Sequence, residues 1–253
     1  MDLESQRKRI YELFSSNSYL LIILDACRYD ALAKLGAEPV ESVGSCTPEW
    51  IKGTFTKPLD AVLVTGNPWY AKLNSHRFFK SVEYLFIDFW DSELETVHPR
   101  WVKAIAMKYV MKGENLIAHF VQPHAPIVNE KWLRQHPEMR MTARMLYMLL
   151  NHNIKVRRLY KEGYFANLQY VLRYATSLAK MAKSRGYRVV ITSDHGELFG
   201  TYDPKSATYV ILKRRARRRI LSIPFYLLGI WRMAGHPSGY RHPDLITVPW
   251  IEI

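Results

Sequence analysis

The sequence predicts an α/β protein in which a mainly parallel sheet lies between layers of helices. Several short apolar runs are nearly continuous, which is typical of parallel strands that are buried on both faces. Helical patterns separate these runs, and such alternation favours an α/β sandwich. A chain of 253 residues with 48% hydrophobic and 13% aromatic content is large enough for a sizeable core.

The predicted elements alternate along the chain. Strands are expected at 19–24, 61–65, 84–89, 115–121 and 187–193, and helices at 4–16, 97–112, 138–150 and 163–185. The last helix has the clearest apolar stripe, which includes Leu168, Val171 and Leu178, and it ends at Gly186. No internal repeat or low-complexity linker interrupts the pattern, so residues 1–253 are expected to form one domain.

Charge and composition set expectations about partners and location. The formal net charge is +13, which favours anionic partners. Two cysteines provide no disulfide framework, the N-terminal segment is charged throughout, and the apolar run 220–231 is too short to span a bilayer. We therefore predict a cytoplasmic protein, either soluble or peripheral to a membrane. Residues 213–231 join a basic run to apolar residues, which is typical of a solvated face or of a membrane contact. Nucleic acid is a less favoured partner, because no recognisable nucleic-acid module accompanies the run.

Polar residues follow three of the predicted strands. Asp25 comes directly after 19–24, His124 follows 115–121, and Asp194, His195 and Glu197 follow 187–193. In open α/β sheets, ligands bind beyond the carboxyl ends of the strands, where several loops converge. Each residue also has a simpler interpretation: Asp25 would cap a helix, the segment around His124 would be a structural loop, and Gly196 would take a positive φ in a turn. Their joint occurrence favours one shared crevice.

The residues of this crevice suit a metal. Asp25, Asp194 and His195 offer two carboxylates and one imidazole, a set that fits Zn²⁺ or Mn²⁺, with Mg²⁺ and Ca²⁺ as alternatives. Three protein ligands would leave a position open for a hydroxyl or a substrate oxygen. A serine or threonine hydroxyl bound there would lose its proton more easily and become a nucleophile.

The motifs together resemble those of the alkaline phosphatase superfamily, especially its sulfatase-like and lipid-head-group phosphotransferase branches. They are "LIILDACRYD", a nucleophile loop about twenty residues later, "QPHAP", "SDHGELFG" and "GHP", and they cover most of the chain in order. The resemblance implies a three-layer sandwich with a central mixed, mainly parallel sheet. It implies that Asp25, Asp194 and His195 are metal ligands and that the nucleophile touches the metal. It also implies that His124 and His236 hold a second metal or the transferred group.

The nucleophile loop, "SVGSCTPEW" at 42–50, offers three candidates. Sulfatases use a cysteine in C-x-P-x-R that is oxidised to formylglycine. Cys46 and Pro48 fit that pattern, but Trp50 stands where it requires arginine. Phosphatases and phosphotransferases use an unmodified threonine or serine. Thr47 is therefore favoured over Cys46, and Ser45 is third.

The resemblance implies a metal-dependent hydrolase or transferase that acts on phosphate esters through Thr47. Arg28 would stabilise developing negative charge, and His124 and His236 would orient the substrate or assist the leaving oxygen. A helical insertion at about 126–160 would cover the crevice. The expected substrate is an anionic small-molecule, glycan or lipid-head-group ester. The alternatives are a sulfatase that uses Cys46 as formylglycine and a non-catalytic protein that binds anionic lipid or nucleic acid.

Overall fold

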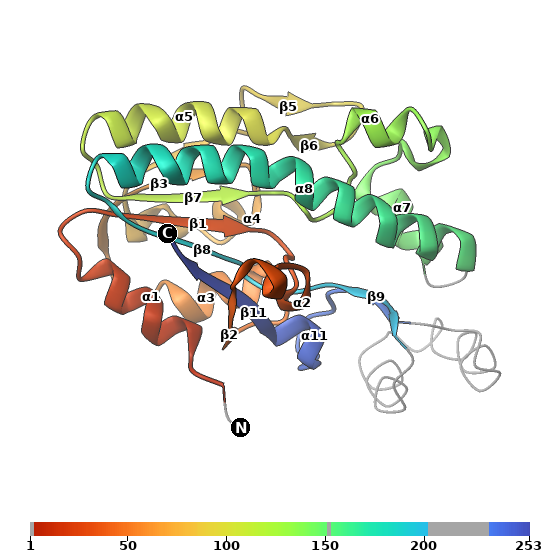
Figure 1. Ribbon diagram of the computed structural model, residues 1–253, viewed down its shortest axis with the longest axis horizontal. Helices are drawn as coiled ribbons and strands as arrows, with labels where there is room; N and C mark the ends of the chain where they lie inside the picture. The colour runs from red at the N-terminus through yellow and green to blue at the C-terminus, as the bar shows by residue number, and fades with distance from the viewer. Residues whose placement is uncertain (1–2, 151–152, 202–232) are drawn as a thin grey trace.

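The computed structural model describes residues 3–150, 153–201 and 233–253. In these residues the main sheet has seven strands in the order β2-β11-β8-β1-β7-β3-β4 (Figure 1). The strands are β1 Tyr19–Leu24, β2 Glu38–Glu41, β3 Leu59–Thr65, β4 Phe79–Tyr84, β7 Leu116–Phe120, β8 Arg188–Thr192 and β11 Thr247–Glu252. Strand β11 is antiparallel to β8 and to β2, and the other neighbouring pairs are parallel. The predicted mixed, mainly parallel sheet is confirmed.

Two small sheets and the helices complete the described fold. The small sheets pair β5 Trp90–Asp91 with β6 Thr96–Val97, and β9 Leu198–Thr201 with β10 Met233–Gly235. The helices are α1 Gln6–Phe14, α2 Tyr29–Leu32, α3 Thr47–Thr54, α4 Trp69–Lys72, α5 Pro99–Met111, α6 Glu130–Leu133, α7 Ala143–Leu150, α8 Ile154–Ser184 and α11 Pro243–Ile246. Across these described ranges, none of the helices has the length and apolar character that a membrane span requires.

The sheet separates two apolar cores because side chains alternate along each strand. In β1 all six residues are buried; Leu20 and Ile22 pack in the core beneath α5 and α8, whereas Leu21 and Ile23 pack in the core that α1 and α3 cover. Figure 1 shows α5 and α8 on one side of the sheet and α1 and α3 on the other. The protein is therefore the three-layer sandwich that the sequence resemblance implies.

Most predicted elements lie within a few residues of their expected bounds, and the largest errors have physical causes. The strand predicted at 84–89 is wrong, because the strand is β4 and residues 85–89 form turns. An edge strand has only one strand partner, so β4 can carry exposed Lys80 and Ser81. In the residues that follow, Leu85, Phe86 and Phe89 pack on the core. Helix α8 begins nine residues before the predicted 163, and the predicted 138–150 is a short 3-10 turn followed by α7.

Strands β2 and β11 were not predicted, because each contains a proline and proline argues against a strand. Pro39 and Pro249 are paired in the register of these two strands. Helix α3 was also not predicted, because its first four residues belong to the segment 42–50, which was expected to be a loop.

One buried glutamine joins three elements beside the sheet. Gln6, in the first turn of α1, donates through Nε2 to Thr192 Oγ1 at 2.8 Å and to the Ser193 carbonyl oxygen at 2.5 Å. Its Oε1 accepts from Trp50 Nε1 of α3 at 2.8 Å. Gln6 and Trp50 are fully buried, so water cannot take the place of these hydrogen bonds if one of them is lost. This side chain therefore fixes α3 against the end of β8.

Gln6→Met should lower the free energy of unfolding by about 3 kcal/mol, because it leaves buried polar groups unpaired. Urea denaturation followed by circular dichroism measures the loss. The matched control is Gln135→Met, whose side chain is exposed and which should change stability by less than about 0.5 kcal/mol. Equal stabilities of the two variants would contradict this role of Gln6.

Candidate active site

The carboxyl ends of β1, β3 and β7 open into one cavity of about 570 Å³. Loops after β1 and β7 carry Asp25 and His124, the loop after β8 carries the Asp194–His195 pair next to Asp25, and His236 approaches from the end of β10. The cavity lining includes Asp25, Cys46, Thr47, Asn67, His124 and His236. The structure thus brings together predicted site residues that are far apart in the sequence.

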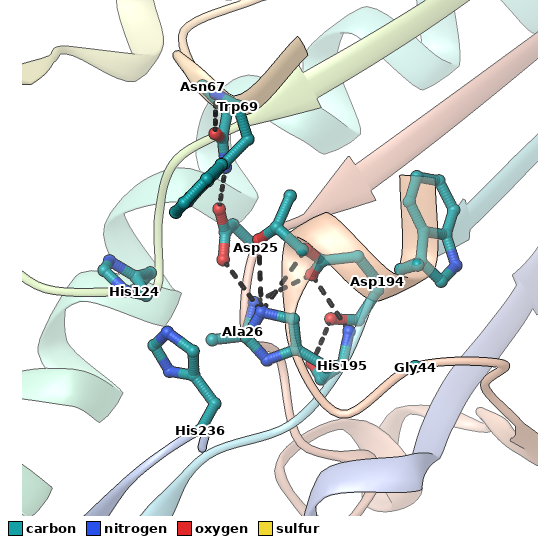
Figure 2. Close-up of polar contacts among 12 residues, drawn as sticks. Asp25, Ala26, Gly44, Asn67, Trp69, His124, Asp194, His195 and His236 are labelled. Atoms are coloured by element: carbon teal, nitrogen blue, oxygen red, sulfur yellow. Dashed lines mark hydrogen bonds and ion pairs between the residues drawn. The ribbon is translucent and has the colours of Figure 1, made fainter. Parts of the chain in front are cut away.

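Asp25, Asp194 and His195 form a compact group on the floor of this site. One ligand atom from each lies within 4.8 Å of the others, and all three residues are buried. His195 Nε2 is 3.6 Å from Asp25 Oδ1 and 3.4 Å from Asp194 Oδ2. Figure 2 shows the three side chains pointing toward one another, with His124 and His236 nearby.

Hydrogen bonds orient one oxygen of each carboxylate and leave the other facing the group. Asp194 Oδ1 accepts from the backbone N–H groups of Ala26 at 3.1 Å and His195 at 2.9 Å. Asp25 Oδ2 accepts from Asn67 Nδ2 at 2.6 Å. The remaining oxygens, Asp25 Oδ1 and Asp194 Oδ2, are buried without a hydrogen-bond partner in the described residues. Unpartnered buried carboxylate oxygens need a cation or a proton.

His195 presents a neutral nitrogen to the same point. Its Nδ1 donates to the Gly196 carbonyl oxygen at 2.8 Å, so the lone pair of Nε2 faces the two carboxylates. Burial, reinforced by the neighbouring His236, keeps the pKa of His195 well below its usual range. The neutral imidazole is the form that binds a metal.

Gly196 does not serve the positive-φ turn considered in the sequence analysis. A Cβ at this position would lie 1.9 Å from the carbonyl oxygen of Asp244. The Gly196 N–H also donates to the Leu245 carbonyl oxygen at 2.7 Å. Glycine is required here because two backbone segments approach closely behind the site.

The group fits a divalent metal. Burial and the nearby Asp194 raise the pKa of Asp25 well above its usual range, and a cation bound beside the carboxylates would oppose both effects. Two carboxylate oxygens and one imidazole nitrogen form a donor set that binds Zn²⁺ and leaves a coordination position open. The structure therefore contains a buried Asp/His group that is able to bind a metal.

Thr47 lies directly beside this group. It is the first residue of α3, it is 4% exposed, and its Oγ1 is 3.2 Å from His195 Nε2. Cys46 also lines the cavity, but burial raises the pKa of its thiol, which disfavours the thiolate. The Ser45 hydroxyl is within 3.0 Å of Glu49 Oε2 and of the Pro237 carbonyl oxygen, so its hydrogen is engaged outside the metal group.

The loop that carries Thr47 is fixed by the surrounding core. Ser42 Oγ donates to the Asp194 carbonyl oxygen at 2.5 Å, which ties the loop to the metal group. A Cβ on Gly44 would lie 2.5 Å from Trp50 N, so the chain must be glycine there. Trp50, which replaces the arginine of the sulfatase pattern, is fully buried and bonded to Gln6. This position therefore supports α3 instead of facing a substrate.

A second group of potential ligands adjoins the first. It consists of His124, Glu197 and His236, with one ligand atom of each within 4.8 Å of the others. His236 Nδ1 is 3.3 Å from Glu197 Oε2. The rings of His236 and His195 are 4.5 Å apart between centroids, so the two groups adjoin through these two histidines.

The pKa values of this second group diverge. Although burial opposes ionisation, His236 and further hydrogen bonds lower the pKa of Glu197 to about 2. Desolvation is outweighed at His236, because the Glu197 carboxylate raises its pKa. Desolvation and the charge of His236 lower the pKa of His124 to about 4. At neutral pH the Glu197 carboxylate is therefore anionic and the His124 imidazole is neutral, while His236 holds its proton more tightly than a histidine usually does.

Sequence reasoning did not assign several residues of this site. Glu197 lies in the "SDHGE" motif but received no role, and Tyr147 and Tyr160 donate to its Oε2 at 2.8 and 3.0 Å. Asn67 follows β3 in "TGNP", a strand-end position that could have indicated it. His119 lies inside β7, and its unpartnered Nε2 is 3.8 Å from Asp25 Oδ2 and 3.9 Å from Asp194 Oδ2 in the described residues. A histidine within an apolar strand was its only sequence signal.

The structure does not bring Arg28 into the cavity. Its guanidinium forms ion pairs with Asp30 and Asp244 at 2.8 Å each and donates to the Glu197 carbonyl oxygen at 2.9 Å. Arg28 lines a separate pocket of about 220 Å³.

The predicted membrane contact through 213–231 lies outside the described residues.

Comparison with known proteins identifies related folds. No protein-family model matches the sequence, and no curated protein matches it. The structure is similar to the integral membrane lipooligosaccharide phosphoethanolamine transferase A of Neisseria meningitidis, with a TM-score of 0.55 and 11% identity over 93% of this chain and 47% of that protein. This chain therefore spans about half the length of that transferase.

Two further structures have the same fold. The C-terminal periplasmic domain of EcEptC from Escherichia coli, solved in complex with zinc, has a TM-score of 0.55 and 14% identity over 92% of this chain and 71% of that domain. A putative sulfatase from Bacteroides thetaiotaomicron has a TM-score of 0.51 and 14% identity over 93% of this chain and 64% of that protein. At these identities the shared property is the fold. The chain therefore shares its fold with phosphoethanolamine transferases and with a putative sulfatase, as the motif resemblance implies.

The comparisons contradict the predicted cytoplasmic location. The similar structures include a periplasmic domain and an integral membrane transferase. The prediction depended on the low cysteine number and on the charged N-terminal segment. The charged N-terminal segment forms α1 and packs on the sheet, and a low cysteine number does not identify a compartment, so neither feature supports the predicted location.

Zinc at one hundred times its dissociation constant should raise the free energy of unfolding by about 2.7 kcal/mol, because zinc binds the folded site. Asp194→Asn should abolish this gain and remove one equivalent of zinc, as measured by denaturation and by elemental analysis. Asparagine keeps the oxygen that accepts from Ala26 and His195. The matched control is Asp60→Asn, an 84% exposed aspartate that should leave both readouts unchanged. Retention of all the zinc by Asp194→Asn would contradict this metal site.

Proposed function

We propose that the protein is a zinc-dependent transferase or hydrolase that acts on phosphate esters through a Thr47 nucleophile. The observation that carries this proposal is the position of Thr47 Oγ1, which lies 3.2 Å from His195 Nε2 at the edge of the metal group. We further infer that residues 1–253 act as one catalytic domain in which the helical segment 126–160 walls the cavity. Ala143 at the start of α7 lines the cavity, which supports this inference.

Asp25, Asp194 and His195 would hold the metal, with Thr47 completing the set. The bound cation would lower the pKa of the Thr47 hydroxyl and neutralise charge on the phosphoryl oxygens. Thr47 would release its proton to solvent, and its oxygen would then attack phosphorus from the N-terminus of α3. That helix end places backbone positive charge near the phosphoryl group. Asn67 would keep Asp25 oriented through its 2.6 Å hydrogen bond.

The second group would handle the leaving oxygen. As the bond from phosphorus to the leaving oxygen breaks, His236 would donate the proton that this oxygen needs, because Glu197 raises the pKa of His236. His124, whose pKa is about 4, would be neutral at pH 7 and could accept the proton of the incoming water or alcohol. That acceptor would attack the phosphothreonine and release Thr47. Hydrolysis and transfer differ in this acceptor alone.

The substrate class follows from charge and from the comparison. A phosphoethanolamine transferase and a zinc complex occur among the structures with this fold, which supports phosphoryl transfer with zinc. A net charge of +13 favours an anionic ester, whether a small molecule, a glycan or a lipid head group. We infer that a lipid-head-group ester fits best. Such an ester is anionic, which suits the basic chain, and a lipooligosaccharide phosphoethanolamine transferase shares the fold.

Thr47→Ala should lower kcat/KM toward nitrophenyl phosphate or a nitrophenyl phosphodiester by about a thousandfold or more, because the nucleophile is lost. The adjacent Cys46→Ala is the matched control and should retain activity within about threefold. Both variants should keep the zinc content that the aspartate and histidine ligands provide.

The sulfatase alternative gives the opposite result. It requires Cys46 to be converted to an aldehyde with loss of sulfur, so mass spectrometry of the peptide that contains Cys46 distinguishes the two enzymes. An aldehyde at this position, together with inactive Cys46→Ala and active Thr47→Ala, would replace the threonine mechanism. A protein without zinc and without ester turnover would instead indicate the non-catalytic alternative.

A further inference from the structure

Helix α7 exposes an apolar face on the outside of the molecule. Met145, Met148 and Leu149 are 55%, 69% and 41% exposed, and their spacing places them on one side of the helix. Ile154, which is 77% exposed, follows at the start of α8. We call these four residues the α7 apolar face.

The opposite side of α7 is anchored to the active site. Leu146 and Leu150 are buried in the core that includes Tyr160. Tyr147 donates to Glu197 at 2.8 Å, so this helix contributes directly to the wall of the second ligand group. The α7 apolar face is therefore presented by a helix whose orientation is fixed by the site, and within the described ranges nothing covers it.

Basic residues flank this face. The segment 131–161 contains eight lysines and arginines and one acidic residue, Glu138. Arg144, Lys155 and Arg158 are exposed close to the α7 apolar face in the sequence. Arg158 forms an ion pair with Glu162 at 3.1 Å, but both side chains stay largely in solvent, with exposures of 83% and 45%. An apolar helix face with a basic border is the pattern of a helix that lies on an anionic bilayer.

The cavity opens near the same helix. Its lining includes Ala143, the first residue of α7, together with Trp69 and Trp90, which are both 41% exposed. Tryptophan is enriched where proteins meet the membrane interface. Figure 1 shows α7 at the end of the molecule toward which β1 and β7 point, which is the end that carries the site.

We propose that the α7 apolar face rests on the surface of an anionic bilayer and holds the cavity beside the lipid head groups. Methionine and isoleucine side chains would enter the head-group boundary, and the flanking cations would pair with lipid phosphates. An ester carried on a lipid could then reach Thr47 without leaving the bilayer. This surface goes beyond the proposed reaction, since binding to vesicles requires no turnover.

Met148→Asp in the full chain tests this surface by co-sedimentation with vesicles of equal parts phosphatidylcholine and phosphatidylglycerol. The variant should bind about tenfold more weakly or worse, because it removes an inserted side chain and adds a repelled charge. The matched control is Met111→Asp. Met111 is 58% exposed at the last turn of α5, at the opposite end of the sheet, and this variant should bind within about twofold of the wild type. Wild-type binding should weaken in high salt and on pure phosphatidylcholine.

Several outcomes would overturn the proposal. Unchanged vesicle binding by Met148→Asp, or an equal loss in Met111→Asp, would show that the membrane contact lies elsewhere or is absent. Sedimentation velocity without vesicles tests for self-association. If the wild type is a dimer and Met148→Asp is a monomer, this face is an interface between copies of the chain. Equal thermal midpoints and zinc contents would establish that both variants are folded.

Vesicle binding can be tested independently of the proposed enzymatic activity. Met148 lies outside the catalytic groups, so Met148→Asp should retain wild-type turnover of soluble nitrophenyl phosphate. Loss of vesicle binding with retained turnover supports both proposals. Absence of turnover in every variant would end the enzyme proposal and leave the vesicle measurement intact.

Discussion

The structure depends on two carboxylates that are buried side by side at the edge of the sheet. Asp25 follows β1 and Asp194 follows β8, and the parallel register that pairs Ile23 with Thr192 brings the two strand ends together. Burying such charges costs several kcal/mol each unless hydrogen bonds and an opposite charge compensate. Backbone N–H groups and Asn67 satisfy one oxygen of each, and the two oxygens left over define the place of a cation. The surrounding architecture can be understood as the support of this arrangement.

The two ligand groups favour different positive species, a cation or a proton, because the charges around them differ. The first group has two carboxylates around a neutral His195, and positive charge is what it lacks. The second group has one carboxylate, Glu197, between two imidazoles, and it is already close to charge balance. Tyrosine hydroxyls from α7 and α8 hold Glu197 in place, so helices outside the sheet control the second group. A cation is thus favoured at the first group and a proton at the second.

Site residues could be predicted from the sequence where they lie directly beyond a recognisable apolar strand. Asp25 directly follows β1, and Asp194 and His195 lie within three residues of the end of β8. Parallel strands leave their carboxyl ends at one edge of the sheet, so the convergence of these residues could be predicted. Arg28 also follows a strand, but Asp30, two residues along the chain, and Asp244, more than two hundred residues away, hold its guanidinium in a different pocket. A partner as distant as Asp244 leaves no local signal. Tyr147 was unpredictable for the same reason, because its contact with Glu197 depends on how α7 packs.

The position of Thr47 shows how a short loop obtains a fixed geometry. The loop is too short to have a core of its own, and its immediate turn would not hold a hydroxyl to within a few tenths of an ångström. Instead, Trp50 is locked by Gln6, and Ser42 binds the backbone of Asp194 itself. The proposed nucleophile and the proposed metal ligands are therefore tied to one another through the strand end at β8, and a shift of one displaces the other. Catalytic geometry of this kind needs rigid supporting contacts, and the core residue at position 50 provides them where a sulfatase-type arginine would face the substrate.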